Sequence, residues 1–290
     1  MSIPEITLII ITHYSPKEEY GQSKPPSDYL VSKTYDSIRR EFSHFERNVT
    51  EKILVYNRPR NFTNDSIAYD HNLETFCKDN NFLYVKTPNE GLREALRLSL
   101  SLAENKLILF VEHDWEFVSK IDTDNLLHAI SRPGINLINF STRKIDARQT
   151  EKSISYSNFP YVTPKLSFGN GSYIVKKDYL INLIKLSEPT LNIKFVLGAI
   201  FFKPNVWTLG FFLRIIRSKF PSFAGRIIPL SVFDSKYQYV WPYLNNMEFV
   251  LDTYYKTDMY LRGVDEAHKR WGIYWYGDIN DGPYMVHQGR

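Results

Sequence analysis

Apolar residues fall into short continuous runs that alternate with segments of helical periodicity through the first 111 residues. Residues 6–11 form an almost unbroken apolar run rich in isoleucine, which is typical of a strand buried on both faces. Residues 106–111 are nearly all apolar and predict a second such strand. Between these two runs the pattern predicts a helix over 28–42, a strand over 52–56, a helix over 64–78, a strand over 82–86 and a helix over 92–103.

The alternation of strands and helices with short connections predicts a parallel sheet with helices on both faces. Beyond residue 121 the rhythm is weaker, but strands are expected over 136–140 and 173–175, and a helix over 177–186. We therefore expect an α/β fold with a mostly parallel, Rossmann-like sheet and a helical, aromatic-rich C-terminal portion.

Polar residues and prolines cluster at 145–165, and this segment is the nearest thing to a domain boundary in the chain. We interpret residues 1–145 and 146–290 as two halves of one domain.

The composition is that of an ordinary globular protein, with 43% hydrophobic and 23% charged residues among 290. The formal charge of +4 is far below the basic excess of a nucleic-acid-binding protein, so we expect no nucleic-acid partner. The single cysteine, Cys77, excludes an intramolecular disulfide and a cysteine zinc cluster. Residues 1–12 lack the features of a signal peptide, and no apolar run reaches the ~18 residues of a membrane-spanning helix. These features predict a cytoplasmic location.

Residues 189–233 differ from the rest, because these 45 residues contain six Lys or Arg and no Asp or Glu. Aromatic residues are interleaved with the basic ones, as in a helix that lies on anionic lipid. Peripheral membrane contact through this insert is one interpretation. A packed helical insert with one basic solvated face explains the composition equally well.

The end of the second buried run carries two acids spaced one residue apart, Glu112 and Asp114. In open parallel sheets ligands bind beyond the carboxyl ends of the strands, so both carboxylates can project toward one site. Carboxylate oxygens suit Mg²⁺ and Mn²⁺, which normally also bind substrate phosphates. The alternative is a polar strand end with a helix-capping role.

The stretch that leads into this strand resembles the GT-A glycosyltransferases, especially their large inverting family. The family's spaced pattern of asparagine, glycine and alanine is matched by Asn89, Gly91, Ala95 and Ala103, followed by the acidic strand end. The resemblance covers roughly residues 5–120. It departs from the family at four positions, where the chain has Asn57, Arg97, Ser99 and Glu112.

This resemblance implies a GT-A fold in which residues 1–145 bind a nucleotide-sugar donor and residues 146–290 bind the acceptor. It implies a divalent metal, Mn²⁺ or Mg²⁺, held by Asp114, His287 and Glu112, since the terminal His287-Gln288-Gly289 matches a family motif. The donor residues implied are Thr12, His13, Tyr14, Asn57, Asn89, Arg93, Arg97, Glu112 and His113. The residues implied on the sugar and acceptor side are Gly169, Asn170, Gly171 and Trp241.

An inverting transferase needs a carboxylate that takes a proton from the acceptor hydroxyl. The family's acidic motif is best matched by Glu248, which precedes an apolar run, and Asp234 and Asp252 are its competitors. A first-turn glutamate favoured by the helix dipole explains Glu248 as well.

Other assignments also keep an alternative. Arg93 and Arg97 share a helix face and suit a diphosphate, yet a solvated face paired with Glu90 or Glu94 is an equal explanation. His287 can be an exposed terminal histidine, and the glycines at 169 and 171 can form a plain hairpin turn.

The function predicted from the sequence is that of a metal-dependent, inverting glycosyltransferase. It would move a sugar from a nucleotide-diphosphate sugar to a hydroxyl of a glycan or lipid-linked acceptor. A sugar-nucleotide nucleotidyltransferase is disfavoured, because no Gly-rich, basic phosphate loop follows the first strand. The alternative that is not an enzyme is a GT-A-like domain that binds glycans or a membrane without catalysing a reaction.

Overall fold

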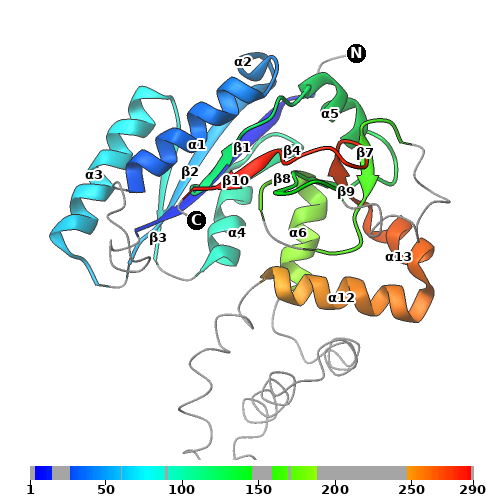
Figure 1. The fold of residues 1–290 in the computed structure, drawn as a ribbon. Helices are drawn as coiled ribbons and strands as arrows, with labels where there is room; N and C mark the ends of the chain where they lie inside the picture. Colours follow the sequence, from blue (N-terminus) through cyan, green and yellow to red (C-terminus); the bar gives the residue numbers. More distant parts are fainter. Residues whose placement is uncertain are drawn as a thin grey trace, which may run out of the picture.

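An eight-stranded sheet with helices on both faces forms the body of the protein in the computed structural model (Figure 1). The structure describes residues 4–14, 27–59, 61–88, 91–145, 159–168, 171–187 and 247–288. The strand order is β3-β2-β1-β4-β8-β6-β9-β7, and a separate two-stranded ribbon is formed by β10 and β5.

Four parallel strands make up the N-terminal half of the sheet, and they end at the same edge. The register joins His13 to Asn57 and Asn57 to Thr87, while Ile11 lies opposite Glu112. The strands are β1 (Ile6–His13), β2 (Val49–Asn57), β3 (Leu83–Thr87) and β4 (Leu107–Glu112). The helices between them are α1 (Ser27–Glu41), α2 (Phe45–Asn48), α3 (Asn64–Asp79) and α4 (Leu92–Leu102).

The C-terminal half continues the sheet with mixed direction. The strand β8 (Tyr173–Lys176) runs antiparallel to both β4 and β6 (Leu137–Asn139). Next come β9 (Ile273–Tyr276), parallel to β6, and the edge strand β7 (Val162–Pro164). The helices of this half are α5 (Thr123–Ile130), α6 (Lys177–Leu186), α12 (Met247–Arg262) and α13 (Val264–Trp271).

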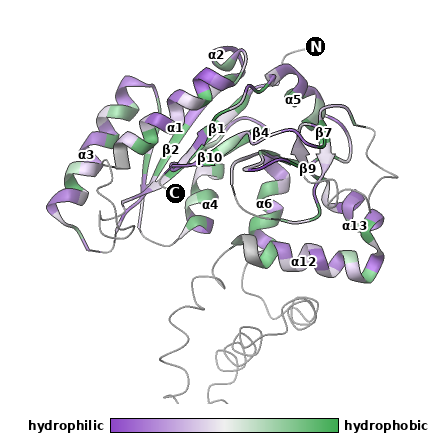
Figure 2. Ribbon diagram, viewed as in Figure 1, coloured by the Kyte–Doolittle hydropathy of each residue, from purple (hydrophilic) through white to green (hydrophobic). Residues whose placement is uncertain are grey.

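Alternate residues of the buried strands enter two separate cores, one on each face of the sheet. In β1, Leu8 and Ile10 belong to the core that contains residues of α1, α3 and α5, whereas Ile9 and Ile11 belong to the core that contains residues of α4, α6, α12 and α13. This two-faced burial is why β1 is a continuous apolar run. The helices carry hydrophobic and hydrophilic residues together (Figure 2), as expected when only one stripe of each helix is buried.

The fold-class prediction is confirmed: the protein is α/β, with a mostly parallel sheet flanked by helices. The elements expected up to residue 111 are present with ends shifted by at most a few residues, and the helix over 177–186 has the predicted bounds. The strand expected over 136–140 is limited to its three central residues. Among the described residues, no helix is long and apolar enough to cross a membrane.

Some sequence predictions concern residues outside the described part of the chain. These are the insert 189–233, Asn89, Gly169, Asn170, Asp234, Trp241 and the side chain of Glu248.

A buried histidine links α13 to α12 behind the sheet. His268 is 1% exposed, and its Nδ1 lies 3.0 Å from the hydroxyl of Tyr255, which in turn donates to the carbonyl oxygen of Lys165. Burial lowers the pKa of His268 to about 4, against the opposing effect of Asp265. The histidine is therefore neutral in the native protein at pH 7.

Unfolding should become easier as the pH falls from about 6.5 to about 4, because the unfolded chain takes up a proton on this histidine before the native protein does. A shift to about 4 corresponds to a loss of about 3 kcal/mol from the free energy of unfolding. We expect His268→Gln to flatten this part of the pH dependence, measured by urea unfolding at pH 7 and pH 4.5. The exposed His71 provides the control variant His71→Gln, and equal slopes in the two variants would contradict the assignment.

Candidate functional site

The carboxyl ends of β3, β2, β1 and β4 bring polar residues to one edge of the sheet. The register aligns Thr87, Asn57 and His13 there, with Glu112 at the end of the next strand. Ligands of open α/β sheets bind at this edge, beside the point where the strand order reverses. This edge is the candidate functional site.

A tight turn after β4 carries Asp114, and a strand from the far end of the chain lies beside it. The turn leads into β5 (Trp115–Phe117), which pairs antiparallel with β10 (Met285–His287), so that His287 lies opposite Trp115. His287 Nε2 is 2.8 Å from Asp114 Oδ2, and both side chains are about one-fifth exposed. The rings of Trp115 and His287 pack edge to face at 5.1 Å. Two residues remote in sequence thus form one polar pair.

Each member of this pair keeps a buried polar atom without a hydrogen-bond partner among the described residues. These atoms are Asp114 Oδ1 and His287 Nδ1. A buried polar atom that lacks a partner is costly, and such atoms are common where a ligand or ion binds.

The pair fits a divalent metal as two of its ligands. Adjacent ligands of an octahedral Mg²⁺, each at about 2.1 Å, are about 3 Å apart, close to the spacing between Nε2 and Oδ2. Within the described ranges no group of three or more His, Cys, Asp or Glu side chains is arranged for a metal. The remaining positions would therefore fall to substrate phosphate and water, as is usual for Mg²⁺ sites.

His113 precedes Asp114 in the chain and contacts a further histidine, His13. His113 is buried, its amide donates to the carbonyl of Ile11, and its ring packs edge to face with that of the exposed His13 at 4.9 Å. Burial, and then the proximity of His13, lower the pKa of His113 to about 4. His113 therefore adds no positive charge near Asp114 at neutral pH.

The residues of β1 and β2 that the sequence predicts to bind a donor contact the side chains around them. The hydroxyl of the buried Thr12 is hydrogen-bonded to that of Tyr69, and the ring of Tyr14 packs on Tyr69 at 5.9 Å. Asn57 Oδ1 accepts a hydrogen bond from the Thr87 hydroxyl at 3.3 Å. This bond directs the amide's donor group away from Thr87.

The two arginines of α4 lie in its first turns. Arg97 is about half exposed and forms an ion pair of 3.1 Å with Glu94, one of the pairings that the sequence left open. Arg93 is partly buried. A role for either in binding a diphosphate stays a prediction.

Gly171, which the sequence assigns to the sugar and acceptor side, lies against the strand that carries His287. Its backbone has φ +108°, and a Cβ added there would lie 3.1 Å from Met285 Cε. Behind the loop, Asp252 of α12 accepts hydrogen bonds from the amide of Phe168 at 3.0 Å and from Lys256 Nζ at 2.6 Å. Glu248 lies one turn earlier on α12, in its first turn.

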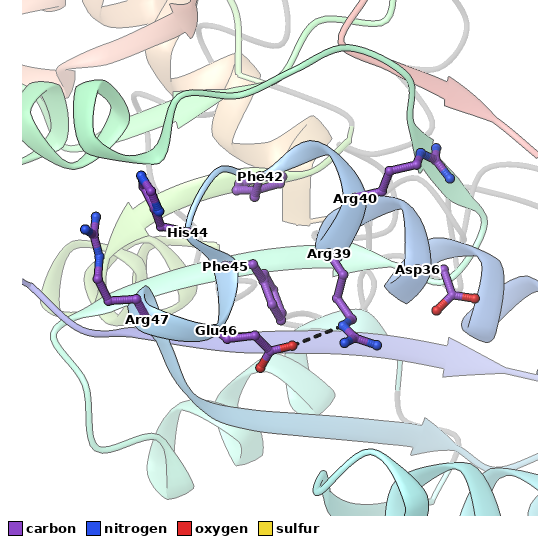
Figure 3. Close-up of a pocket in the computed structure, with 8 residues that line it drawn as sticks. All are labelled: Asp36, Arg39, Arg40, Phe42, His44, Phe45, Glu46 and Arg47. Atoms are coloured by element: carbon purple, nitrogen blue, oxygen red, sulfur yellow. Dashed lines mark hydrogen bonds and ion pairs between the residues drawn. The ribbon is translucent and has the colours of Figure 1, made fainter.

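A shallow pocket of about 490 Å³ lies at the corner between α1 and α2 (Figure 3). The last residue of α2 directly precedes β2, so this pocket lies at the amino end of that strand, at the opposite edge from Asp114. Its arginines are already paired: Arg39 with Glu46 at 3.1 Å, Arg40 with Glu41 at 2.6 Å, and Arg47 with Asp124. We assign no function to it.

Sequence reasoning missed the residues that hold the turn at Asp114. Thr34 of α1 and Gln288 after β10 are both buried and hydrogen-bonded there. No local signal marks Thr34, whereas Gln288 lies inside the terminal motif that identified His287.

The sheet order and the antiparallel β8 beside β4 are those of an α/β fold with a mostly parallel sheet, as the sequence predicted. No protein-family model and no curated protein matches the sequence.

Solved structures with similar folds include glycosyltransferases. A mannosyltransferase from Pyrobaculum calidifontis, solved with GDP-mannose and Mn²⁺, is 16% identical over 63% of this chain and 47% of its own, with a TM-score of 0.42. GalNAc-T7, solved with UDP, GalNAc and Mn²⁺, is 12% identical over 62% of this chain and 37% of its own, with a TM-score of 0.44.

A nucleotidyltransferase is also among them. CMP-2-keto-3-deoxy-manno-octonic acid synthetase, solved with CTP, is 15% identical over 63% of this chain and 78% of its own, with a TM-score of 0.41. The chain thus spans about half of the mannosyltransferase and just over a third of GalNAc-T7.

Replacing Gly171 with alanine should destabilise the protein, because the residue is in the left-handed half of backbone space and faces Met285. We expect a loss of about 1–3 kcal/mol, measured by urea unfolding. Gly263→Ala is the matched control, since its φ of +85° is similar but open space surrounds its added Cβ. If Gly171→Ala costs no more than Gly263→Ala, the loop is not pressed against β10.

Proposed function

We propose that this protein is a metal-dependent glycosyltransferase that uses a nucleotide-diphosphate sugar as donor. The observation that carries the proposal is the contact between Asp114 and His287 at the carboxyl edge of the sheet, each with a buried atom that has no partner among the described residues. Asp114 and His287 would hold the metal, while Glu112 is not gathered with them into a three-ligand group among the described residues. Bound Mn²⁺ or Mg²⁺ would neutralise charge on the departing nucleoside diphosphate.

The chain's own residues would bind and orient the donor around this pair. His13 and Asn57 end neighbouring strands at the same edge, so both are candidates to contact the nucleoside. The amide of Asn57 can donate a hydrogen bond where the carboxylate of the resembled family can only accept one. Arg93 and Arg97 would approach the phosphates from α4, and for Arg97 this requires release from Glu94.

The acceptor would enter from the side of the Gly171 loop and α12. Glu248 would take the proton from its hydroxyl as the hydroxyl attacks the anomeric carbon opposite the departing nucleoside diphosphate. Such a single displacement inverts the configuration at that carbon. The competitor Asp252 already accepts two hydrogen bonds from the protein, so it is less suited to this role. A glycan or a lipid-linked sugar is the acceptor class we infer, with residues 189–233 near the membrane in the second case.

Donor binding should require Asp114 and His287. A nucleoside diphosphate at about 100 times its Kd stabilises the protein by about 2.7 kcal/mol, which raises the Tm by several degrees. We expect this shift for the wild type with UDP or GDP in the presence of Mn²⁺, and its loss in Asp114→Asn and in His287→Gln. Differential scanning fluorimetry measures it.

Asp36→Asn, on the exposed side of α1, removes one negative charge elsewhere and should keep the full shift. An undiminished shift in Asp114→Asn would remove this residue from the metal site. If the wild type gains no stability from any nucleoside diphosphate, the chain is a GT-A-like domain that does not bind such donors.

Glu248→Gln should leave donor affinity unchanged and slow transfer about 10²–10⁴-fold, because a general base acts only on the acceptor. Glu266→Gln is the matched control, since Glu266 is likewise a glutamate in the first turn of a helix. Calorimetry gives the donor affinity, and single-turnover assays give the rate with a panel of glycan and lipid-linked acceptors. Equal rates in the two variants would assign Glu248 to helix stability, and weakened donor binding would place it in the donor pocket.

A further inference from the structure

A buried chain of hydrogen bonds holds the turn that carries Asp114. Thr34 of α1 is fully buried and Gln288 is 6% exposed. Gln288 Nε2 donates to the Thr34 hydroxyl at 2.9 Å. That hydroxyl lies within donating distance of two carbonyl oxygens, 2.6 Å from that of His113 and 2.8 Å from that of Trp115.

The backbone of Gln288 completes the arrangement. Its amide donates to the carbonyl oxygen of Asp114 at 2.7 Å. Three consecutive carbonyls, those of residues 113, 114 and 115, thus lie within hydrogen-bonding distance of Thr34 or Gln288, and the one hydroxyl proton of Thr34 is shared between two of them. Gln288 directly follows His287 in the chain and is hydrogen-bonded to the backbone of Asp114. It therefore connects the backbones of the two residues of the candidate metal pair.

We propose that Thr34 and Gln288 are positioning residues that set the distance between Asp114 and His287 and thereby tune metal affinity. The inference deepens the proposed function and rests on it. Hydrogen-bonding partners that orient metal ligands typically change affinity by about 10–100-fold when they are removed.

The cost of the arrangement supports a positioning role. Gln288 Oε1 is buried and has no hydrogen-bond partner among the described residues. An unsatisfied buried acceptor is costly, so an apolar residue of the same size would serve stability at least as well. The side-chain amide of Gln288 has a role through its Nε2 group, which donates to the Thr34 hydroxyl. This bond turns the hydroxyl proton of Thr34 toward the two carbonyls.

One turn further along α1, Ser37 is a buried hydroxyl residue that can be compared with Thr34. Ser37 is also fully buried; its hydroxyl donates to the carbonyl of Thr34 at 2.7 Å and accepts from the amide of Phe117 at 3.0 Å. Ser37 therefore joins α1 to β5 at a point beyond the turn, and both of these partners lie outside residues 113–115. Its removal should loosen the helix and leave the metal pair in place.

The test compares Thr34→Val, Thr34→Ser and Ser37→Ala in the full chain. Mn²⁺ affinity is titrated by electron paramagnetic resonance with saturating UDP or GDP, whichever stabilises the wild type. We expect Thr34→Val to weaken Mn²⁺ binding by about 10–100-fold, Thr34→Ser to restore most of it, and Ser37→Ala to bind like the wild type although urea unfolding shows it is destabilised. Gln288→Met tests the same network from the other end, should Thr34→Val fail to fold.

A second readout needs no metal. Hydrogen exchange at the Gln288 amide reports its bond to Asp114, and we expect faster exchange in Thr34→Val but not in Ser37→Ala. Wild-type Mn²⁺ affinity retained in Thr34→Val and Gln288→Met would overturn the positioning role. If the wild type itself binds no Mn²⁺ with either nucleotide, the proposed function fails instead, and faster exchange in Thr34→Val would still support the role of Thr34 in holding the turn.

Discussion

The short ribbon of β5 and β10 is the interaction on which the candidate site depends. The large sheet brings the ends of β1, β2 and β4 to one edge, but it does not bring His287 there. The antiparallel pairing of Trp115 with His287 places the imidazole of His287 against Asp114. The ribbon has three residues per strand, too few to be stable alone, so its geometry depends on the side chains that fix it to α1.

At this edge of the sheet, burial has a larger effect on the pKa of His113 than the charged groups around it. His113 is adjacent to Asp114 in the chain, and in its cationic form it would compete with any metal for the aspartate's charge. Burial prevents this, since it lowers the pKa of His113 to about 4. At neutral pH the His113 ring is therefore uncharged and does not compete with a ligand at Asp114.

Much of the fold could be predicted from the sequence, because its strands are buried on both faces. The runs that became β1 and β4 are almost wholly apolar, and α4 and α6 have a clear apolar stripe. The ribbon was not predicted, since three residues show no periodicity and its two strands are far apart in sequence. Asp114 and His287 were each suggested by resemblance, but their contact depends on that long-range pairing.

The polar supports of the site were harder still to foresee. Thr34 looks like any polar residue inside a helix, and only the packing of α1 on β5 gives its hydroxyl two carbonyls to bind. The pairing of Arg97 with Glu94, in contrast, follows from helical spacing and was among the alternatives.

The separation of the ribbon from the large sheet has a consequence for the order of assembly during folding. None of the eight strands of the large sheet is β5 or β10, so that sheet can form before the two strands of the ribbon pair. Closing the loop between β5 and β10 is an entropic cost that the packed sheet has already reduced by bringing the attachment points together. The contact between Asp114 and His287 can therefore form last, on a scaffold that already exists, and folding of the sheet and assembly of the candidate site become separable events.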